Sequence, residues 1–273
     1  MLWRSIPIFL WPTVIEYYFK RLLGIRPSIL ESNWVYFLRI ALPINISVRK
    51  SNDGYHIFNP QTGLTAIVRP NSSDILVYIQ IFFHKEYIRI EGLELPPRPT
   101  IIDLGANVGL FMLYCKYKWH DAVVSCLEPD LQNYTLLIKQ IEVNTLTDVQ
   151  TINGGIWTTN ALLSITQLPE KMEWSLVVKP DASGNVLGIT LPQLLRDSGF
   201  RKVDLLKMDI EGTEEYLFES VDFLTTIKNS VSNLIMETHN PKKQKWIATQ
   251  LTTIGFTVEF DRELLFASKA ERL

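Results

Sequence analysis

A glycine-rich turn between two apolar runs is the first feature of this sequence that could bind a ligand. The run TIIDL contains Asp103, the segment GANVG follows at residues 105–109, and the run LFMLYCKYK comes next. A turn of this kind between a strand and a helix lets a ligand approach the backbone and leaves amide donors free at the start of the helix. Phosphates, carboxylates and dinucleotides are all bound in this way, so the turn predicts an anion-binding loop without selecting its ligand.

The residue types inside the turn narrow the choice of ligand. A dinucleotide fingerprint carries glycine at the position of Asn107, because the pyrophosphate passes close to the chain there. Asn107 therefore argues against a nicotinamide cofactor. The amino-acid tail of S-adenosylmethionine suits the loop better, since its carboxylate can accept the loop amides around Gly105 and Gly109 while Asp103 meets its ammonium group. The alternative is a tight turn that binds nothing.

Glu128 ends the next apolar run, AVVSCLE, 23 residues after Gly105. An acidic side chain at about this spacing accepts hydrogen bonds from both hydroxyls of a ribose. A carboxylate before Pro129 can also be a simple N-terminal helix charge, but its occurrence together with the glycine loop favours ribose binding.

A second sharp turn is expected after the run VQTIN, at Asn153, Gly154, Gly155 and Ile156. Backbone groups there could read the edge of an adenine, with Ile156 or the next residue, Trp157, covering the ring. A simple turn explains the glycines nearly as well.

Three charged residues of the same parity, Lys207, Asp209 and Glu211, occur in the segment VDLLKMDIEG. Alternate residues of a strand point to the same side, so the three share one face if the strand remains extended. A lysine in a central parallel strand is buried, so its charge needs either a partner or a role in the site. We therefore expect Lys207 to form a buried ion pair with Glu237 or Asp209, or to take a direct part in the chemistry.

Asp209 lies at the carboxyl end of this strand, where the chemistry of a parallel sheet is expected. If a bound S-adenosylmethionine gives its methyl group to an alcohol, a general base is needed, for which Asp209 and His239 are the candidates. We expect Glu211 to cap the following helix or to orient the substrate. No ligand cluster has recognisable metal spacing, so no metal is predicted, although Asp209 and Glu237 could hold a hard cation.

The elements that must position these residues follow a proline-rich linker, ELPPRPT. Strand-like and helix-like runs then alternate, with one helix expected over EEYLFESVDFLTTI, a hairpin inserted from Ala161 to Lys179, and a terminal antiparallel hairpin formed by FTVEF and ELLFAS. This pattern predicts an α/β fold with a Rossmann-like, mainly parallel sheet that binds ligands at the carboxyl ends of its strands.

We expect two domains, an N-terminal extension over residues 1–97 that could cap the substrate site and a cofactor-binding domain over residues 98–273. The extension looks helical before about Asn45, and ILVYIQIFF favours a β-rich or mixed element. The aromatic N-terminus has too short an apolar run to span a membrane and lacks the features of a secretory signal. We expect it to form a helix that packs on the catalytic domain, with a membrane-surface or partner-binding helix as the alternative.

Composition limits the partners of the chain. A net charge of −2 and a pI near 6.1 supply no basic field for a phosphate backbone, so nucleic acid is not an expected substrate. The two cysteines, Cys115 and Cys126, make neither a disulfide framework nor a zinc cluster, and they suit a cytoplasmic protein.

The segment VDLLKMDIEGTEEYLF, together with IIDLGANVGL, CLEPD and NGGIW, resembles the FkbM family of methyltransferases. The resemblance covers about the last two-thirds of the chain and implies the Rossmann-like sheet of class I methyltransferases. It places Gly105, Asn107 and Gly109 in the cofactor loop, Glu128 on the ribose, and Asp209 with Glu211 at the mouth of the fourth strand.

The same resemblance implies a function, S-adenosylmethionine-dependent methylation of a hydroxyl on a sugar, glycolipid or polyketide-type acceptor. His84, Glu86 and Tyr87 could close over that acceptor, according to the layout of the family. A nicotinamide-dependent oxidoreductase and a non-catalytic cofactor-binding scaffold are the alternatives. The sequence predicts neither the particular acceptor nor the oligomeric state.

Overall fold

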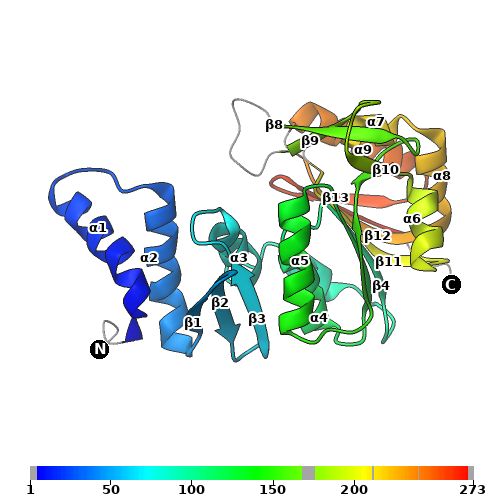
Figure 1. Cartoon of the computed structure of the whole chain (residues 1–273). Helices are drawn as coiled ribbons and strands as arrows, with labels where there is room; N and C mark the ends of the chain where they lie inside the picture. Colours follow the sequence, from blue (N-terminus) through cyan, green and yellow to red (C-terminus); the bar gives the residue numbers. More distant parts are fainter. Residues whose placement is uncertain (1–4, 168–175, 211, 239, 270–273) are drawn as a thin grey trace. The chain divides into compact units, whose positions relative to one another are not determined.

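A computed structural model describes residues 5–167, 176–210, 212–238 and 240–269. The chain forms two compact units (Figure 1). The N-terminal unit comprises Met1–Leu93 together with Lys139–Thr145, and the C-terminal unit comprises Glu94–Ile138 together with Leu146–Leu273.

A seven-stranded sheet with the order β13-β14-β12-β11-β4-β5-β6 forms the centre of the C-terminal unit. Strands β12, β11, β4, β5 and β6 are parallel, and β13 and β14 form the terminal antiparallel hairpin. This confirms the predicted mainly parallel α/β sheet. The strands are β4 (Thr100–Leu104), β5 (Val123–Glu128), β6 (Val149–Asn153), β11 (Val203–Met208), β12 (Val231–Glu237), β13 (Thr257–Asp261) and β14 (Leu264–Ser268).

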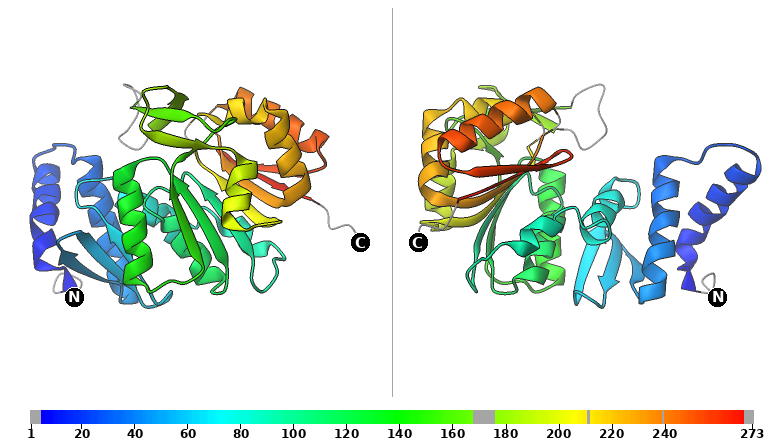
Figure 2. Two further views of the ribbon diagram at one scale, coloured as in Figure 1. Left: turned by 45° about the vertical axis from the view of Figure 1, so that its right-hand side comes forward. Right: turned by 180° about the vertical axis from the view of Figure 1, so that it is seen from behind.

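Helices lie on both faces of this sheet, as the views in Figure 2 show. They are α4 (Leu110–Lys118), α5 (Leu131–Val143), α6 (Leu191–Ser198), α7 (Glu214–Phe218), α8 (Val221–Ser230) and α9 (Pro241–Thr253). The helix expected over residues 214–227 is broken, because Ser220 accepts a hydrogen bond from Phe223 N and starts a new helix, α8.

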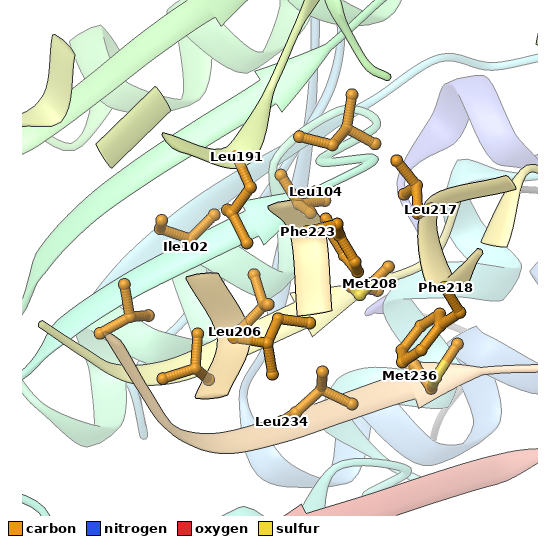
Figure 3. Close-up of a cluster of buried hydrophobic side chains, with 14 of the residues drawn as sticks. Ile102, Leu104, Leu191, Leu206, Met208, Leu217, Phe218, Phe223, Leu234 and Met236 are labelled. Atoms are coloured by element: carbon orange, nitrogen blue, oxygen red, sulfur yellow. The ribbon is translucent and has the colours of Figure 1, made fainter. Parts of the chain in front are cut away.

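Side chains from one face of the sheet pack against α6, α7, α8 and α9 in a large apolar core (Figure 3). Ile102 and Leu104 of β4 contribute to this core, as do Leu206 and Met208 of β11. Because side chains alternate along a strand, the residues between them point to the opposite face. Asp103 and Lys207 are therefore neighbours on that opposite face, in register across β4 and β11.

A smaller sheet follows β6 in the C-terminal unit, with the order β7-β10-β8-β9. Strands β8 (Leu162–Gln167) and β9 (Leu176–Pro180) pair antiparallel, which confirms the predicted hairpin. Strand β10 (Val186–Ile189) was not predicted, and it pairs with β7 (Gly155–Ile156).

The N-terminal unit combines helices with a three-stranded antiparallel sheet. Its elements are η2 (Ile8–Leu10), α1 (Trp11–Leu22), α2 (Ile29–Ala41), η3 (Leu42–Ile44), β1 (Ser47–Ser51), β2 (Gly54–Asn59), β3 (Leu64–Val68), α3 (Asp74–Phe82) and η4 (Ile88–Gly92). Helix α2 starts with a capping box, in which Ser28 and Glu31 each accept a backbone amide of the other. The helical prediction before Asn45 is confirmed.

The prediction of a β-rich or mixed element over ILVYIQIFF is wrong, since this segment lies mostly in helix α3. Its β-branched and aromatic composition favours a strand, but Ile75, Tyr78 and Ile79 are spaced to bury one helix face. None of the helices in the described ranges is both long enough and apolar enough to cross a membrane.

Candidate active site

The carboxyl ends of β4, β5, β6 and β11 bring most of the predicted site residues to one edge of the sheet. The loop after β4 has left-handed backbone at Gly105, Asn107 and Gly109. A Cβ atom on Gly105 would overlap the backbone oxygen of Asp209, and one on Gly109 would overlap the side chain of Leu137. Asparagine tolerates the left-handed region better than most residues, so the loop conformation explains all three residue types.

The first amides of this loop are occupied within the protein, in contrast to the expectation that they are free. Gly105 N and Ala106 N both donate to Leu127 O at 3.0 Å, and Asn107 N donates to Glu128 Oε2 at 2.7 Å. Helix α4 then begins with Gly109 at its N-cap and without a side-chain cap. The donors left for a ligand carboxylate are therefore those of the first turn of α4.

Glu128 is a buried carboxylate at the end of β5, with 4% of its surface exposed. Its Oε2 accepts Asn107 N and its Oε1 accepts Asp130 N at 2.9 Å. Burial raises the pKa of Glu128 to about 7, although the two backbone donors act in the opposite direction. A third donor, Asn133 Nδ2, lies 3.5 Å from Oε1, so Oε2 keeps one free lone pair and Oε1 can accept a ribose hydroxyl in place of this long contact.

Lys207 is the centre of a buried charge cluster. Its Nζ lies 3.0 Å from Asp103 Oδ1 and 3.7 Å from Asp209 Oδ2, and it donates to Gly105 O at 2.7 Å. Burial lowers the pKa of Lys207, but the charges of Asp103 and Asp209 outweigh it, so the net shift is upward and the lysine remains charged. One ammonium group thus connects β4, the cofactor loop and the residue that follows β11.

Asp103 is fully buried, and neither of its oxygens accepts a well-aligned hydrogen bond from the residues that the structure describes. Burial raises its pKa, while the ion pair with Lys207 lowers it in part. Two unsatisfied buried oxygens beside the loop fit a cationic ligand group. In this structure, however, Asp103 faces Lys207, and its contact with a cofactor ammonium stays a prediction.

Asp209 is the accessible carboxylate of this cluster, with 29% of its side chain exposed. Its backbone N donates to Leu104 O at 3.0 Å, which holds it at the end of β11 next to the cofactor loop. The other two catalytic candidates, Glu211 and His239, lie outside the described residues. The structure therefore brings together Lys207 and Asp209 of the four predicted catalytic residues.

Glu214 was missed in the sequence, although it closes the turn after β11. Its Oε1 accepts Gly212 N at 3.1 Å, and Thr213 Oγ1 donates to Ile210 O at 3.2 Å. Both Thr213 and Glu214 are buried. An acidic residue in the first turn of α7, two residues after Gly212, is the sequence signal that could have predicted this role.

The predicted second sharp turn is instead a bend at Gly154 followed by strand β7. Asn153 Nδ2 donates to Glu128 O at 2.9 Å and to Pro129 O at 3.2 Å, so this side chain supports the end of β5. A Cβ atom on Gly154 would lie 2.7 Å from Leu187 O, because β10 packs closely there. Ile156 is buried in the apolar core, and its adenine contact stays a prediction.

The two cysteines lie on the same side of the sheet as the charge cluster, and both are free and buried. Burial raises the pKa of each thiol well above its ordinary value, which makes them poor nucleophiles. Among the residues with described positions, no group of three or more His, Cys, Asp or Glu side chains could hold a metal ion.

Comparisons with known proteins agree with this geometry. The family model of the methyltransferase FkbM domain matches residues 103–268. Methyltransferase sdnD of Sordaria araneosa is 27% identical over 220 residues, which are 68% of this chain and 83% of that protein. The 31-O-demethyl-FK506 methyltransferase FkbM of Streptomyces tacrolimicus is 23% identical over 252 residues, covering 76% of this chain and 91% of that protein.

Among solved structures, the precorrin-6y C5,15-methyltransferase of Geobacter metallireducens is similar at 12% identity and a TM-score of 0.46, covering 68% of this chain and 88% of that one. The family match alone spans more than half of the chain and includes the glycine loop, Glu128 and Asp209. The chain therefore belongs to the FkbM methyltransferase family, and it is a methyltransferase that uses S-adenosylmethionine.

Proposed function

We propose that this methyltransferase acts on a hydroxyl oxygen of a sugar, glycolipid or polyketide-type acceptor, with Asp209 as the general base. The observation that carries the proposal is the position of Asp209, a partly exposed carboxylate at the carboxyl edge of the sheet, one residue after β11. The name of the Streptomyces relative supports transfer to oxygen, since it describes a 31-O-demethyl substrate.

When bound, S-adenosylmethionine supplies a methyl group on a positively charged sulfur. The first turn of α4 binds the carboxylate of the cofactor, and Glu128 accepts the two ribose hydroxyls. Gly154 and the neighbouring backbone lie at the end of β6, where the adenine is expected.

With the cofactor and acceptor bound, Asp209 would accept the proton of the acceptor hydroxyl as its oxygen takes the methyl group and the sulfur becomes a neutral thioether. The ammonium of Lys207, 3.7 Å from Asp209 Oδ2, restrains the carboxylate at this edge. The proton then passes to solvent, which the exposed part of Asp209 allows. The displacement requires the methyl donor and the acceptor oxygen to be held in line, and the residues around the loop would fix the donor.

One exposed aromatic side chain, packed on a buried one, suits a carbohydrate or another ring-containing acceptor. Tyr216 of α7 is 51% exposed, and its ring centroid lies 5.4 Å from that of Trp157, which follows β7. An aromatic face that remains open to solvent can pack against the apolar face of a sugar ring.

The test is a kinetic comparison of Asp209→Asn with the unmodified protein on a panel of sugar, glycolipid and polyketide-type alcohols. We expect kcat to fall about 10²- to 10⁴-fold, the usual contribution of a general base, while S-adenosylhomocysteine still binds. Asp222→Asn, which changes an exposed carboxylate in the first turn of α8, should leave kcat unchanged. Unchanged turnover in Asp209→Asn would exclude this base, and methyl transfer only to nitrogen or carbon would contradict the acceptor class.

A further inference from the structure

Helix α1 presents an apolar face to solvent. Ile15, Phe19 and Leu22 are spaced at i, i+4 and i+7, which places them on one side of the helix, and they are 60%, 59% and 83% exposed. Ile8, before the helix, and Leu23, after it, are also mostly exposed. We call Ile8, Ile15, Phe19, Leu22 and Leu23 the apolar stripe. Helix α1 packs on α2 through another side, where Val14 is buried.

The stripe is a concentration of apolar surface and not a scatter of single residues. Of the 19 exposed large apolar or aromatic side chains in the described ranges, nine lie between Ile8 and Tyr36. Isolated exposed apolar residues are normal on a protein surface, but a contiguous patch marks a site of association.

Charge is concentrated in the same part of the chain. The first 50 residues contain seven Lys or Arg and two Glu, a net charge of +5, so the rest of the chain carries −7. Arg21, which precedes Leu22 in the chain, and Arg26, which follows the helix, are both exposed. Lys20 is instead paired with Glu16 and Glu31, each at 2.7 Å.

We infer that the N-terminal unit docks on an anionic phospholipid surface, with α1 lying in the plane of the interface. An amphipathic helix that combines an apolar face with flanking arginines has the chemistry of an interfacial helix. A second copy of the same face fits less well, because it would bring together two 50-residue segments that each carry a charge of +5. The proposed membrane contact is peripheral, since none of the described helices can cross a bilayer.

A cavity between α1 and α2 has matching chemistry. It has a volume of about 160 Å³, and its walls include Val14, Val35 and Leu38 as well as Arg39. Apolar walls with one cation suit an amphiphile that has an alkyl chain and an anionic head, which is the chemistry of an anionic lipid.

The experiment is co-sedimentation of the full chain with vesicles of phosphatidylcholine alone and of phosphatidylcholine mixed with phosphatidylserine. We expect binding to the mixed vesicles to be at least about 10-fold stronger than to the neutral ones, and to weaken as salt is added. Absence of binding to the mixed vesicles would overturn the inference, and so would binding that is independent of lipid charge.

Paired variants test the surface itself. Ile15→Glu with Leu22→Glu should lower vesicle binding at least about 10-fold, because both residues would enter the interface. Val221→Glu with Phe260→Glu, the same charge change on exposed apolar residues of the C-terminal unit, should leave vesicle binding unchanged. Binding of S-adenosylhomocysteine verifies that the C-terminal unit of each double variant is folded, and an unchanged far-ultraviolet circular dichroism spectrum verifies that the helices are intact.

A third variant, Arg21→Gln with Arg26→Gln, leaves the apolar stripe intact and should reduce binding to the mixed vesicles only. Equal vesicle binding by the unmodified chain and the Ile15→Glu, Leu22→Glu variant would overturn the inference. If the unmodified chain instead self-associates without lipid and this variant does not, the stripe is an interface between copies, and the membrane assignment is wrong.

Discussion

Glu128 holds a buried carboxylate between the cofactor loop and the end of β5, and this position makes the protein sensitive to pH. Its folded-state pKa, about 7, is above the value of 4.5 for an exposed glutamate. A raised carboxyl pKa means that the protonated form stabilises the folded state. This contribution is complete below the unfolded pKa and is lost as the pH rises through about 7, with a total of at most about 3 kcal/mol.

We therefore predict that the ligand-free protein loses stability between about pH 5 and about pH 8 and that Glu128→Gln reduces this loss. Urea unfolding at the two pH values measures this loss of stability. Binding of S-adenosylhomocysteine should show the opposite trend, since the ribose hydroxyls bind the ionised carboxylate. A pH dependence of stability that is the same in Glu128→Gln would show that another group is responsible.

Lys207 is the subject of a second prediction. We predict that it positions the cofactor loop by donating a hydrogen bond to Gly105 O. Lys207→Met leaves Asp103 buried without its ion pair, which should cost about 3–5 kcal/mol of unfolding free energy. Asp103→Asn together with Lys207→Met removes both charges, so stability should largely return. Affinity for S-adenosylhomocysteine should not return, because Gly105 O still lacks its donor and the ligand ammonium also loses the carboxylate of Asp103.

Urea unfolding and calorimetry on the single and double variants separate these effects. If the double variant binds S-adenosylhomocysteine as tightly as the unmodified protein, Lys207 has only a structural role. Lys207→Arg, which keeps the charge, serves as the conservative control.

The residue types of the site could be predicted from sequence, but their partners could not. The spacing of Gly105 and Glu128 and the parity of Lys207 and Asp209 are local features, and the structure brings these residues to one edge. The occupied loop amides depend on Leu127 O and Glu128, which are about twenty residues away in the chain. The buried ion pair of Asp103 depends on Lys207, which lies in a different strand.

At the scale of elements, the cofactor loop lies very close to the end of β11. This close approach brings the cofactor-binding residues next to the catalytic candidate Asp209. Gly105 and Gly199 have nearly the same left-handed backbone, with φ of +72° and +70°. A Cβ atom at Gly199 would meet nothing within 4 Å, whereas one at Gly105 would overlap the backbone of Asp209.

We predict that Gly199→Ala costs about 1 kcal/mol, the usual strain of a left-handed alanine, and leaves cofactor binding intact. Gly105→Ala should cost more and should abolish binding of S-adenosylhomocysteine, because the loop and β11 must separate. Thermal unfolding and calorimetry provide the comparison. Similar losses in the two variants would mean that strain alone, and not the close approach, requires glycine at position 105.

The elements of the C-terminal unit were largely predictable because strands that are buried on both faces give continuous apolar runs. The break before α8 and the added strand β10 were missed, since each depends on a short polar signal: the capping hydroxyl of Ser220 and pairing with β7. Helix α3 was misassigned because its composition and its periodicity point to different structures.

At the scale of the whole molecule, the two units differ in chemistry. The family match begins at Asp103, so residues 1–93 of the N-terminal unit lie outside it, and they carry the basic, apolar surface described above. The predicted role of residues 1–97 as a substrate cap stays a prediction. Family membership excludes the nicotinamide-dependent alternative, and it agrees with the argument from Asn107 against a dinucleotide.

The most direct measurement is calorimetric titration of the full chain with S-adenosylhomocysteine, in parallel with NADH. We predict one binding site per chain for S-adenosylhomocysteine, no binding of NADH, and loss of the site in Glu128→Ala, because the ribose then has no acceptor at the end of β5. Binding of S-adenosylhomocysteine that is unchanged in Glu128→Ala, or binding of NADH alone, would contradict the assignment of the cofactor to this edge of the sheet.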